Sequence, residues 1–423
     1  MNKRREYFCK LHKKLIEAAK MQDRYDLETV NLIAPASPTP LKYYCNLPLR
    51  HNAIAEGLLE KRPYAGVEGF NRIERIAAEA ACKLFGAEHA NVQPHSVSQA
   101  NQAAYQALLE NGERALAMKF EAGGHLTHGM KRNFSGRFFD FDFYGVDKDG
   151  FLDYAEVEKK AHEFRPKLIV CGASSYPRSI DFKRLAEISK SINAYLMADL
   201  SHPAGLIVAG KFPKPFPHCD VVTFTPDKTM LGPHGGIMLC QKSLKEKIDK
   251  AIHPGVQSSV PLRRIYEMAE CLIDSSKPWF TDYIDRVIRN IKVFEQEFGQ
   301  YPELMVTGGS DTHLMVLNTR KVFGLTGKEA EELLEVIGIL TNRQVVPGEE
   351  LKPYIASGLR LGTSWITARG YSEEDTRIIA RVILENLKDP TNTKLQNQSK
   401  KRMDSLLKVK REKDVWREEV AYR

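Results

Sequence analysis

The sequence lacks long apolar runs, and this absence excludes an ordinary membrane-spanning protein. No uninterrupted apolar stretch in the 423 residues approaches the roughly 20 that a membrane helix needs. The basic start, MNKRREYFCKLHKKLIEAAK, also lacks a continuous apolar core and a small-residue cleavage site. We therefore expect an amphipathic helix there rather than a secretory signal, with an organelle-targeting segment as the alternative.

Cysteine is sparse and shows no pairing pattern. The seven cysteines are odd in number and never spaced as CxxC, and several lie in apolar runs such as LIVCGA and IMLCQ. This pattern is typical of buried, reduced thiols and argues against a disulfide framework or a zinc site. We expect no metal and predict a cytoplasmic protein.

The net charge of +8 is concentrated at the two ends of the chain, in NKRR, KLHKK, SKKRM and KVKREK. Motifs of nucleic-acid-binding proteins are missing, so we interpret these ends as solvated or frayed helices and expect no nucleic-acid partner. The length suggests two or three domains.

The middle of the chain indicates an α/β architecture. The segment FNRIERIAAEAACKLFG has helical apolar spacing and ends at Gly86. Between 166 and 241 the pattern changes to the short apolar runs PKLIVCGA, NAYLMADL, DVVTFTPD and GGIMLC, with helical or polar stretches between them. Such runs predict parallel strands that are buried on both faces.

A chain break near Ser275–Pro278 precedes a long amphipathic helix with an apolar stripe from Phe280 to Phe298. Shorter strand and helix patterns follow it, and the composition becomes polar and charged after Pro390. We predict an N-terminal helical segment (1–30), a large α/β domain (31–279), a smaller α+β domain (280–390) and a charged tail (391–423).

Three chemical signals fall at the carboxyl ends of predicted strands, where parallel sheets bind ligands. Asp199 ends AYLMAD, Lys228 follows VVTFT, and the hydroxyls of Ser96 and Ser98 lie where QPHSVSQAN enters a helix. A helix start is a natural phosphate site. A carboxylate, a lysine and a phosphate cradle together suit pyridoxal phosphate, although Asp199 could instead cap a helix and Lys228 could form a surface ion pair with Asp227.

From about Leu32 to Leu387 the sequence resembles the serine hydroxymethyltransferase family of fold-type I pyridoxal-phosphate enzymes. The resemblance is densest in ANVQPHSVSQAN, GGHLTHG, DLSHPAGLIVAGKFPKPFPHCDVVTFTPDKTMLGPHGG and SGLRLGTSWITARG. It implies the aspartate aminotransferase-like fold, with a large, mostly parallel sheet and a smaller C-terminal domain. It also implies interconversion of serine and glycine, with tetrahydrofolate as the co-substrate that carries one carbon.

The resemblance also implies roles for the residues at matching positions. Lys228 would hold pyridoxal 5′-phosphate as a Schiff base, Asp199 would pair with the ring nitrogen, and His125 would stack on the ring. The other cofactor contacts would be Ser96, Val97, Ser98, Ser174, His202, Thr225 and Gly255, the last reaching in from a partner subunit.

The substrate would be handled by three further residues. Arg360 would bind the carboxylate by a bidentate pair, which lysine could not reproduce. Glu56 would move a proton at the substrate hydroxyl, and Tyr64 would lie nearby, from the neighbouring subunit. A homodimer or a dimer of dimers follows. Without the resemblance, His125 and His202 could be core histidines, Glu56 and Arg360 surface charges, and Tyr64 a packing residue.

The sequence departs from the family pattern in the surroundings of these residues. The family's SENF or SENY is PASP here, THKT is PDKT, GPRGG is GPHGG, and YAEGYPGKRYYGG is IAEGLLEKRPYAGV. The residues that replace a family residue include Pro35, Ala36, Ile54, Pro63, Asp227 and His234. The change at Pro35 removes a hydroxyl that helps to hold the substrate carboxylate.

These departures keep two alternatives open. One is a folate-independent aldolase or transaldolase that acts on threonine-like β-hydroxy amino acids. The other is a non-catalytic paralogue, against which the retained Lys228 argues. The hydroxymethyltransferase remains the leading prediction.

Overall fold

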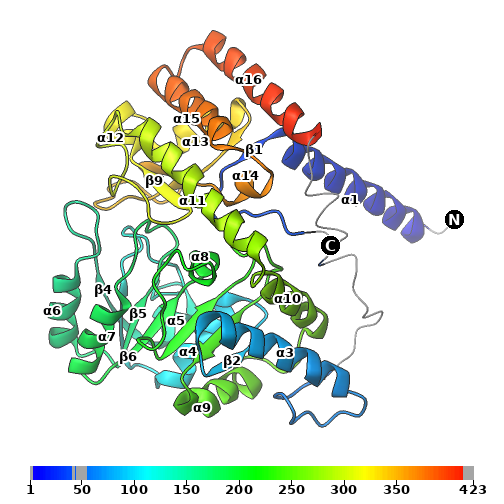
Figure 1. Cartoon of the computed structure of the whole chain (residues 1–423), viewed down its shortest axis with the longest axis vertical. Helices are drawn as coiled ribbons and strands as arrows, with labels where there is room; N and C mark the ends of the chain where they lie inside the picture. Colours follow the sequence, from blue (N-terminus) through cyan, green and yellow to red (C-terminus); the bar gives the residue numbers. More distant parts are fainter. Residues whose placement is uncertain (1–2, 41–42, 44–54, 413–423) are drawn as a thin grey trace.

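A seven-stranded sheet forms the centre of the larger part of the molecule, in a computed structural model that describes residues 3–40, 43 and 55–412 (Figure 1). Its strand order is β2-β8-β7-β6-β5-β3-β4. Strands β3 to β7 run parallel, whereas β8 is antiparallel to both of its neighbours. The strands are β2 (His89–Asn91), β3 (Arg114–Met118), β4 (Asp140–Tyr144), β5 (Leu168–Cys171), β6 (Tyr195–Asp199), β7 (Val221–Phe224) and β8 (Ile237–Cys240).

Helices cover both faces of this sheet, which is why the central strands read as continuous apolar runs. Every residue of β5, β7 and β8 is buried. Along β3, Leu116 belongs to the core that also contains residues of α3 (Glu68–Phe85) and α10 (Leu262–Asp274), whereas its neighbours Ala115 and Ala117 belong to the core that also contains residues of α4 (Val97–Leu108) and α9 (Lys245–Lys250). The predicted α/β fold with a mostly parallel sheet is confirmed.

The helices of the larger part differ in length, and several are single turns. They are α3 (Glu68–Phe85), α4 (Val97–Leu108), α5 (Phe134–Phe138), α6 (Tyr154–Phe164), α7 (Phe182–Ser191), α8 (Ala204–Val208), η1 (Lys242–Leu244), α9 (Lys245–Lys250), η2 (Ala251–Val256) and α10 (Leu262–Asp274).

Helix α11 (Pro278–Phe298) joins the larger part to the smaller one. Proline at its first position suits a helix start, because the missing N–H has no partner there. Phe280 and Ile284 pack in the core of the larger part, and Phe294 and Phe298 pack in that of the smaller part. The apolar stripe read from the sequence therefore serves two cores.

The smaller part contains an antiparallel sheet of order β11-β12-β9. A separate two-residue pairing joins β1 to β10 in parallel. The elements of the smaller part are β1 (Val30–Asn31), β9 (Leu314–Leu317), α12 (Thr319–Phe323), α13 (Gly327–Val336), β10 (Ile339–Leu340), β11 (Asn342–Gln344), β12 (Gly358–Gly362), α14 (Ser364–Ala368) and α15 (Glu373–Lys388). Leu32, expected in the large domain, packs in this smaller core. The division into domains otherwise stays a prediction.

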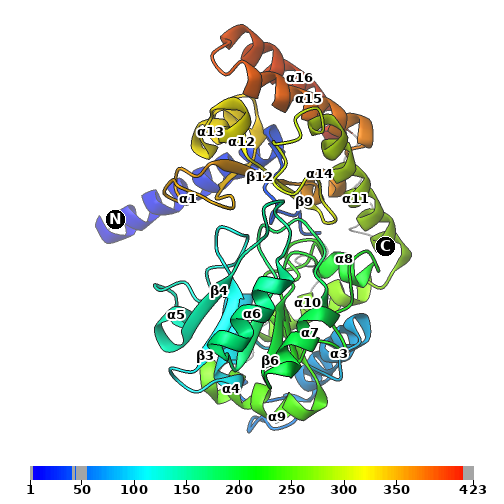
Figure 2. The same ribbon diagram turned by 90° about the vertical axis from the view of Figure 1, so that its left-hand side faces the viewer.

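The two terminal helices lie against the smaller part. Helix α1 (Lys3–Glu28) projects from the body of the molecule (Figure 2), and Tyr25 near its end donates a hydrogen bond to Glu335. Helix α16 (Thr393–Glu412) buries Met403 and Leu407 in the smaller core, so most of the predicted tail is a packed helix.

Parts of the predictions fall outside the described residues, namely Ile54 and the stretch 413–423. Among the residues that are described, helices long and apolar enough to span a membrane are not found.

Candidate active site

Two adjacent parallel strands bring Asp199 and the start of the Lys228 turn to one edge of the sheet. Asp199 is the last residue of β6 and pairs in register with Thr223 of β7. The neighbouring strand β5 is followed by Gly172, whose φ is +99°. A Cβ on Gly172 would lie 2.0 Å from the Asp199 carbonyl oxygen, so only glycine permits this close approach.

The Asp199 carboxylate is buried and accepts hydrogen bonds on both oxygens. Oδ1 accepts from the Ser201 hydroxyl at 2.6 Å, and Oδ2 accepts from Asn101 Nδ2 at 2.8 Å and from His128 Nε2 at 3.3 Å. Burial alone would raise the pKa of Asp199, but the hydrogen bonds and the nearby histidines hold it below its usual value. The Asp199 carboxylate is therefore an anion, and it can pair with a cationic ring nitrogen.

Lys228 lies in a turn just beyond β7 and is partly buried. Burial lowers the pKa of its amine, against the opposing attraction of Asp199 and Asp227, and Arg360 lowers it further. A lowered pKa increases the fraction of neutral amine, which is the nucleophilic form. Within the part of the chain that the structure describes, no ion pair joins Lys228 to Asp227, so the surface-pair alternative finds no support.

Three histidine rings near Asp199 and Lys228 are neutral. Burial is the main cause that lowers the pKa of His125 to about 4 and that of His313 to about 3, and it keeps the pKa of His202 well below 6.5. His125 Nδ1 lies 2.7 Å from the Thr127 hydroxyl. His202 Nδ1 lies 3.3 Å from His313 Nε2, and the two rings are stacked, with an angle of 18° between their planes. Neutral rings can accept or donate hydrogen bonds without adding charge.

Arg360 crosses from the smaller part to the larger one. Its Nη1 donates to the Ser174 carbonyl at 2.6 Å, and its Nε donates to Asn342 Oδ1 at 3.1 Å. Burial lowers the pKa of the guanidinium to about 10, so it is still a cation at neutral pH. These contacts orient a cationic fork that can bind a carboxylate.

The start of α4 offers a phosphate site close to Asp199. Ser96 caps the helix by accepting from the Gln99 amide at 3.3 Å, and Val97 and Ser98 form the first turn. The same helix carries Asn101, which donates to Asp199. The helix start and the strand end are therefore linked by a direct hydrogen bond, and the free amides of the first turn favour an anion.

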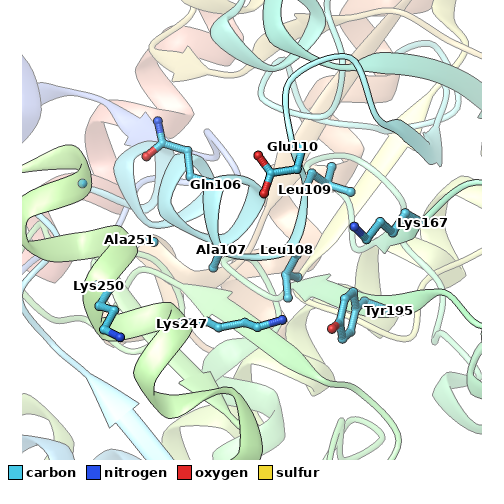
Figure 3. A pocket seen from close by; sticks show the side chains of 11 residues that line it. Gln106, Ala107, Leu108, Leu109, Glu110, Lys167, Tyr195, Lys247, Lys250 and Ala251 are labelled. Atoms are coloured by element: carbon cyan, nitrogen blue, oxygen red, sulfur yellow. The ribbon is translucent and has the colours of Figure 1, made fainter.

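Three further predicted site residues are Glu56, Tyr64 and Gly255. Glu56 forms an isolated bridge with Ser259, and Tyr64 is 37% exposed in the loop before α3. Among the described residues, neither side chain hydrogen-bonds to Lys228. Gly255 lines a cavity of about 490 Å³ at the amino ends of β5 and β6, where Lys167 and Tyr195 also lie (Figure 3).

Sequence reasoning missed several residues that complete the site. His128 lies in the quoted motif GGHLTHG and Asn101 in QPHSVSQAN, so both carried a signal. His313 carried none; it lies in the bend immediately before β9. Ligand atoms of His125, His128 and Asp199 lie within 4.8 Å of one another, close enough for a metal ion, but they belong to the site already described.

The donor set fits pyridoxal phosphate. Four chemical groups lie at one edge of the sheet: a buried anionic carboxylate, an amine of lowered pKa, a neutral imidazole and the amides of a helix start. Each matches one part of the cofactor: the pyridine nitrogen, the aldehyde carbon, the ring face and the phosphate.

Comparison with known proteins agrees with this chemistry. The family model described as serine hydroxymethyltransferase matches residues 13–383. A serine hydroxymethyltransferase of Mycoplasma mycoides subsp. mycoides is 45% identical over 350 residues, which cover 82% of this chain and 85% of the relative. That of Lactobacillus johnsonii is 41% identical over 397 residues, which cover 93% and 96% respectively.

Proposed function

Because the chain belongs to the serine hydroxymethyltransferase family, we propose that the residues gathered around Asp199 and Lys228 form its active site. The protein is a pyridoxal-phosphate-dependent enzyme of fold type I that interconverts serine and glycine, with tetrahydrofolate as the one-carbon carrier. The observation that carries the site is the buried Asp199 anion beside a lysine of lowered pKa.

Bound pyridoxal phosphate supplies an electron sink that stabilises negative charge on the substrate α-carbon. Lys228 would provide the amine that attaches it, and Asp199 would keep a proton on the ring nitrogen. His125 would cover the ring face, with Thr225, His202 and Ser174 around the ring. The phosphate would be held by Ser96, Val97 and Ser98.

Arg360 would bind the substrate carboxylate, since its fork is already oriented by Asn342 and Ser174. The positive charge survives burial, so the interaction is charge-assisted and strong. With proline at position 35, a serine hydroxyl cannot share this task, and more of the binding falls to Arg360.

A homodimer or a dimer of dimers would complete the site. Among the described residues, the side chains of Glu56 and Tyr64 make no hydrogen bond to the Lys228 of their own chain, which fits a role for each at the site of the neighbouring subunit, and the same role is proposed for Gly255. Glu56 would there move the proton of the substrate hydroxyl. Free thiols at the six described cysteines support a reducing compartment, and we propose the cytoplasm.

Glycine formation from serine tests this function, measured on the cofactor-loaded protein with and without tetrahydrofolate. We expect turnover that depends on tetrahydrofolate. Turnover of threonine-like amino acids that is indifferent to tetrahydrofolate would contradict the proposal and favour the aldolase, for which neither the described residues nor the relatives give support.

A further inference from the structure

Two residues beside Lys228 have no part in the roles above, although both depart from the family pattern. Asp227 stands where the family has histidine, and His234 stands where it has arginine. In the structure they contact each other, with His234 Nδ1 2.5 Å from Asp227 Oδ2.

Asp227 also connects other segments of the site wall. Its Oδ1 accepts a hydrogen bond from the Thr225 hydroxyl at 2.6 Å, and Thr225 is only 2% exposed. Its backbone carbonyl accepts from the Ser37 hydroxyl at 2.8 Å. Ser37 follows the altered Pro35 and Ala36, so four of the departures lie along one connected stretch of the wall.

The turn that carries Lys228 needs such support. The Gly232 amide donates to the Pro226 carbonyl at 2.8 Å, and the Leu231 amide donates to the Lys228 carbonyl at 3.0 Å. Leu231 has a φ of +58°, a left-handed conformation that is unfavourable for a residue with a side chain. The contact between Asp227 and His234 joins the two ends of this turn and opposes its relaxation.

We propose that Asp227 and His234 are a positioning pair that fixes the Lys228 turn and the direction of the Thr225 hydroxyl. The proposal rests on the active site proposed above. Neither side chain is placed on a reacting atom: His234 is 65% exposed, and the Asp227 carboxylate is already engaged by Thr225 and His234. The pair therefore acts through the turn.

A double-mutant cycle tests the pair in the full-length, cofactor-loaded enzyme. The variants are Asp227→Ala, His234→Ala and the double variant. We measure kcat and KM for serine, the absorbance maximum of the bound cofactor, and the melting temperature of the protein without cofactor. We expect each single variant to lower kcat and the double variant to be no worse than Asp227→Ala, a coupling of about 3- to 100-fold. KM should change by less than about 3-fold, because the carboxylate site is separate.

Restoring the family residues provides a second test. Asp227→His alone should lower kcat, because two histidines then face each other, and adding His234→Arg should recover most of the loss. The matched control is the exposed ion pair of Arg402 and Glu385 on α16 and α15, 2.7 Å apart. Alanine variants of that pair should show no coupling in kcat.

Two results would overturn the proposal. One is a double variant whose kcat loss is the product of the single losses. The other is a fall in melting temperature that accounts for every kcat change, with no shift in absorbance. A wild type without tetrahydrofolate-dependent turnover would contradict the proposed function instead, and the absorbance cycle would still decide the fate of the pair.

Discussion

Arg360→Lys is the most direct test of the substrate clamp, because it keeps the charge and removes the planar fork. In the wild type, two guanidinium nitrogens are engaged by Ser174 and Asn342, which leaves further N–H groups for a carboxylate. A lysine ammonium has three donors on one nitrogen and cannot serve all of these acceptors.

The magnitude follows from the bonds lost. Removal of one hydrogen bond to a charged group costs about 1.5–3 kcal/mol, which is about 10- to 150-fold in kcat/KM for serine. We expect most of the effect in KM, because the carboxylate is bound equally in the ground state and the transition state. Initial rates of glycine formation over a range of serine concentrations would measure it.

Asn342→Ala is the matched control, since it removes the bond that orients Nε and leaves the guanidinium in place; it also removes the hydrogen bond that Asn342 Nδ2 donates to the Arg343 carbonyl. Its effect should be smaller than that of Arg360→Lys, within about 10-fold. A kcat/KM for Arg360→Lys within about 3-fold of the wild type would refute the assignment of Arg360 as the carboxylate clamp. A loss confined to kcat would refute it as well.

Three further predictions concern the charge, the pH response and the smaller core. Asp199→Asn should keep the fold but lower kcat by at least about 100-fold and change the absorbance of the bound cofactor, because the neutral amide cannot hold the ring proton. A kcat close to that of the wild type would contradict this prediction. His125 and His313 have folded pKa values of about 4 and 3, below their unfolded value, so the unfolded state binds protons first. Stability should therefore fall as pH drops from about 6.5 towards 4, by up to about 1.4 kcal/mol per pH unit for each histidine, in denaturant titrations; a flat profile would contradict it. Met403→Ala should destabilise the smaller core by about 2 kcal/mol or more, whereas an unchanged melting temperature would show that α16 is not packed there.

Much of the larger part was predictable from the sequence because its signals are local. Each buried strand is a short apolar run; Asp199 is the last residue of one such strand, and Lys228 lies in the turn after another. Once parallel strands are inferred, their carboxyl ends must meet at one edge of the sheet. The family motifs then supplied His125 and Arg360, which carry no local signal of their own.

The smaller part was harder to predict because its contacts are long-range. Val30 pairs with Ile339 across most of the chain, and a two-residue strand has no periodicity to detect. His313 reaches His202 only because the smaller sheet is placed beside the larger one. In the charged tail, Met403 and Leu407 are four residues apart, a helical signal that the surrounding lysines obscured.

The departures from the family pattern lie around the reacting group rather than within it. Asp199, Lys228 and Arg360 are present. The Asp199 anion arises from its hydrogen bonds and its histidine neighbours, against the effect of burial, and the lowered pKa of Lys228 arises from burial and from Arg360. At the proposed site, the changed wall from Pro35 to His234 would instead govern how the turn and the substrate are held. Chemistry at the α-carbon therefore depends on the buried group, and the altered wall can change rate and affinity without changing the reaction.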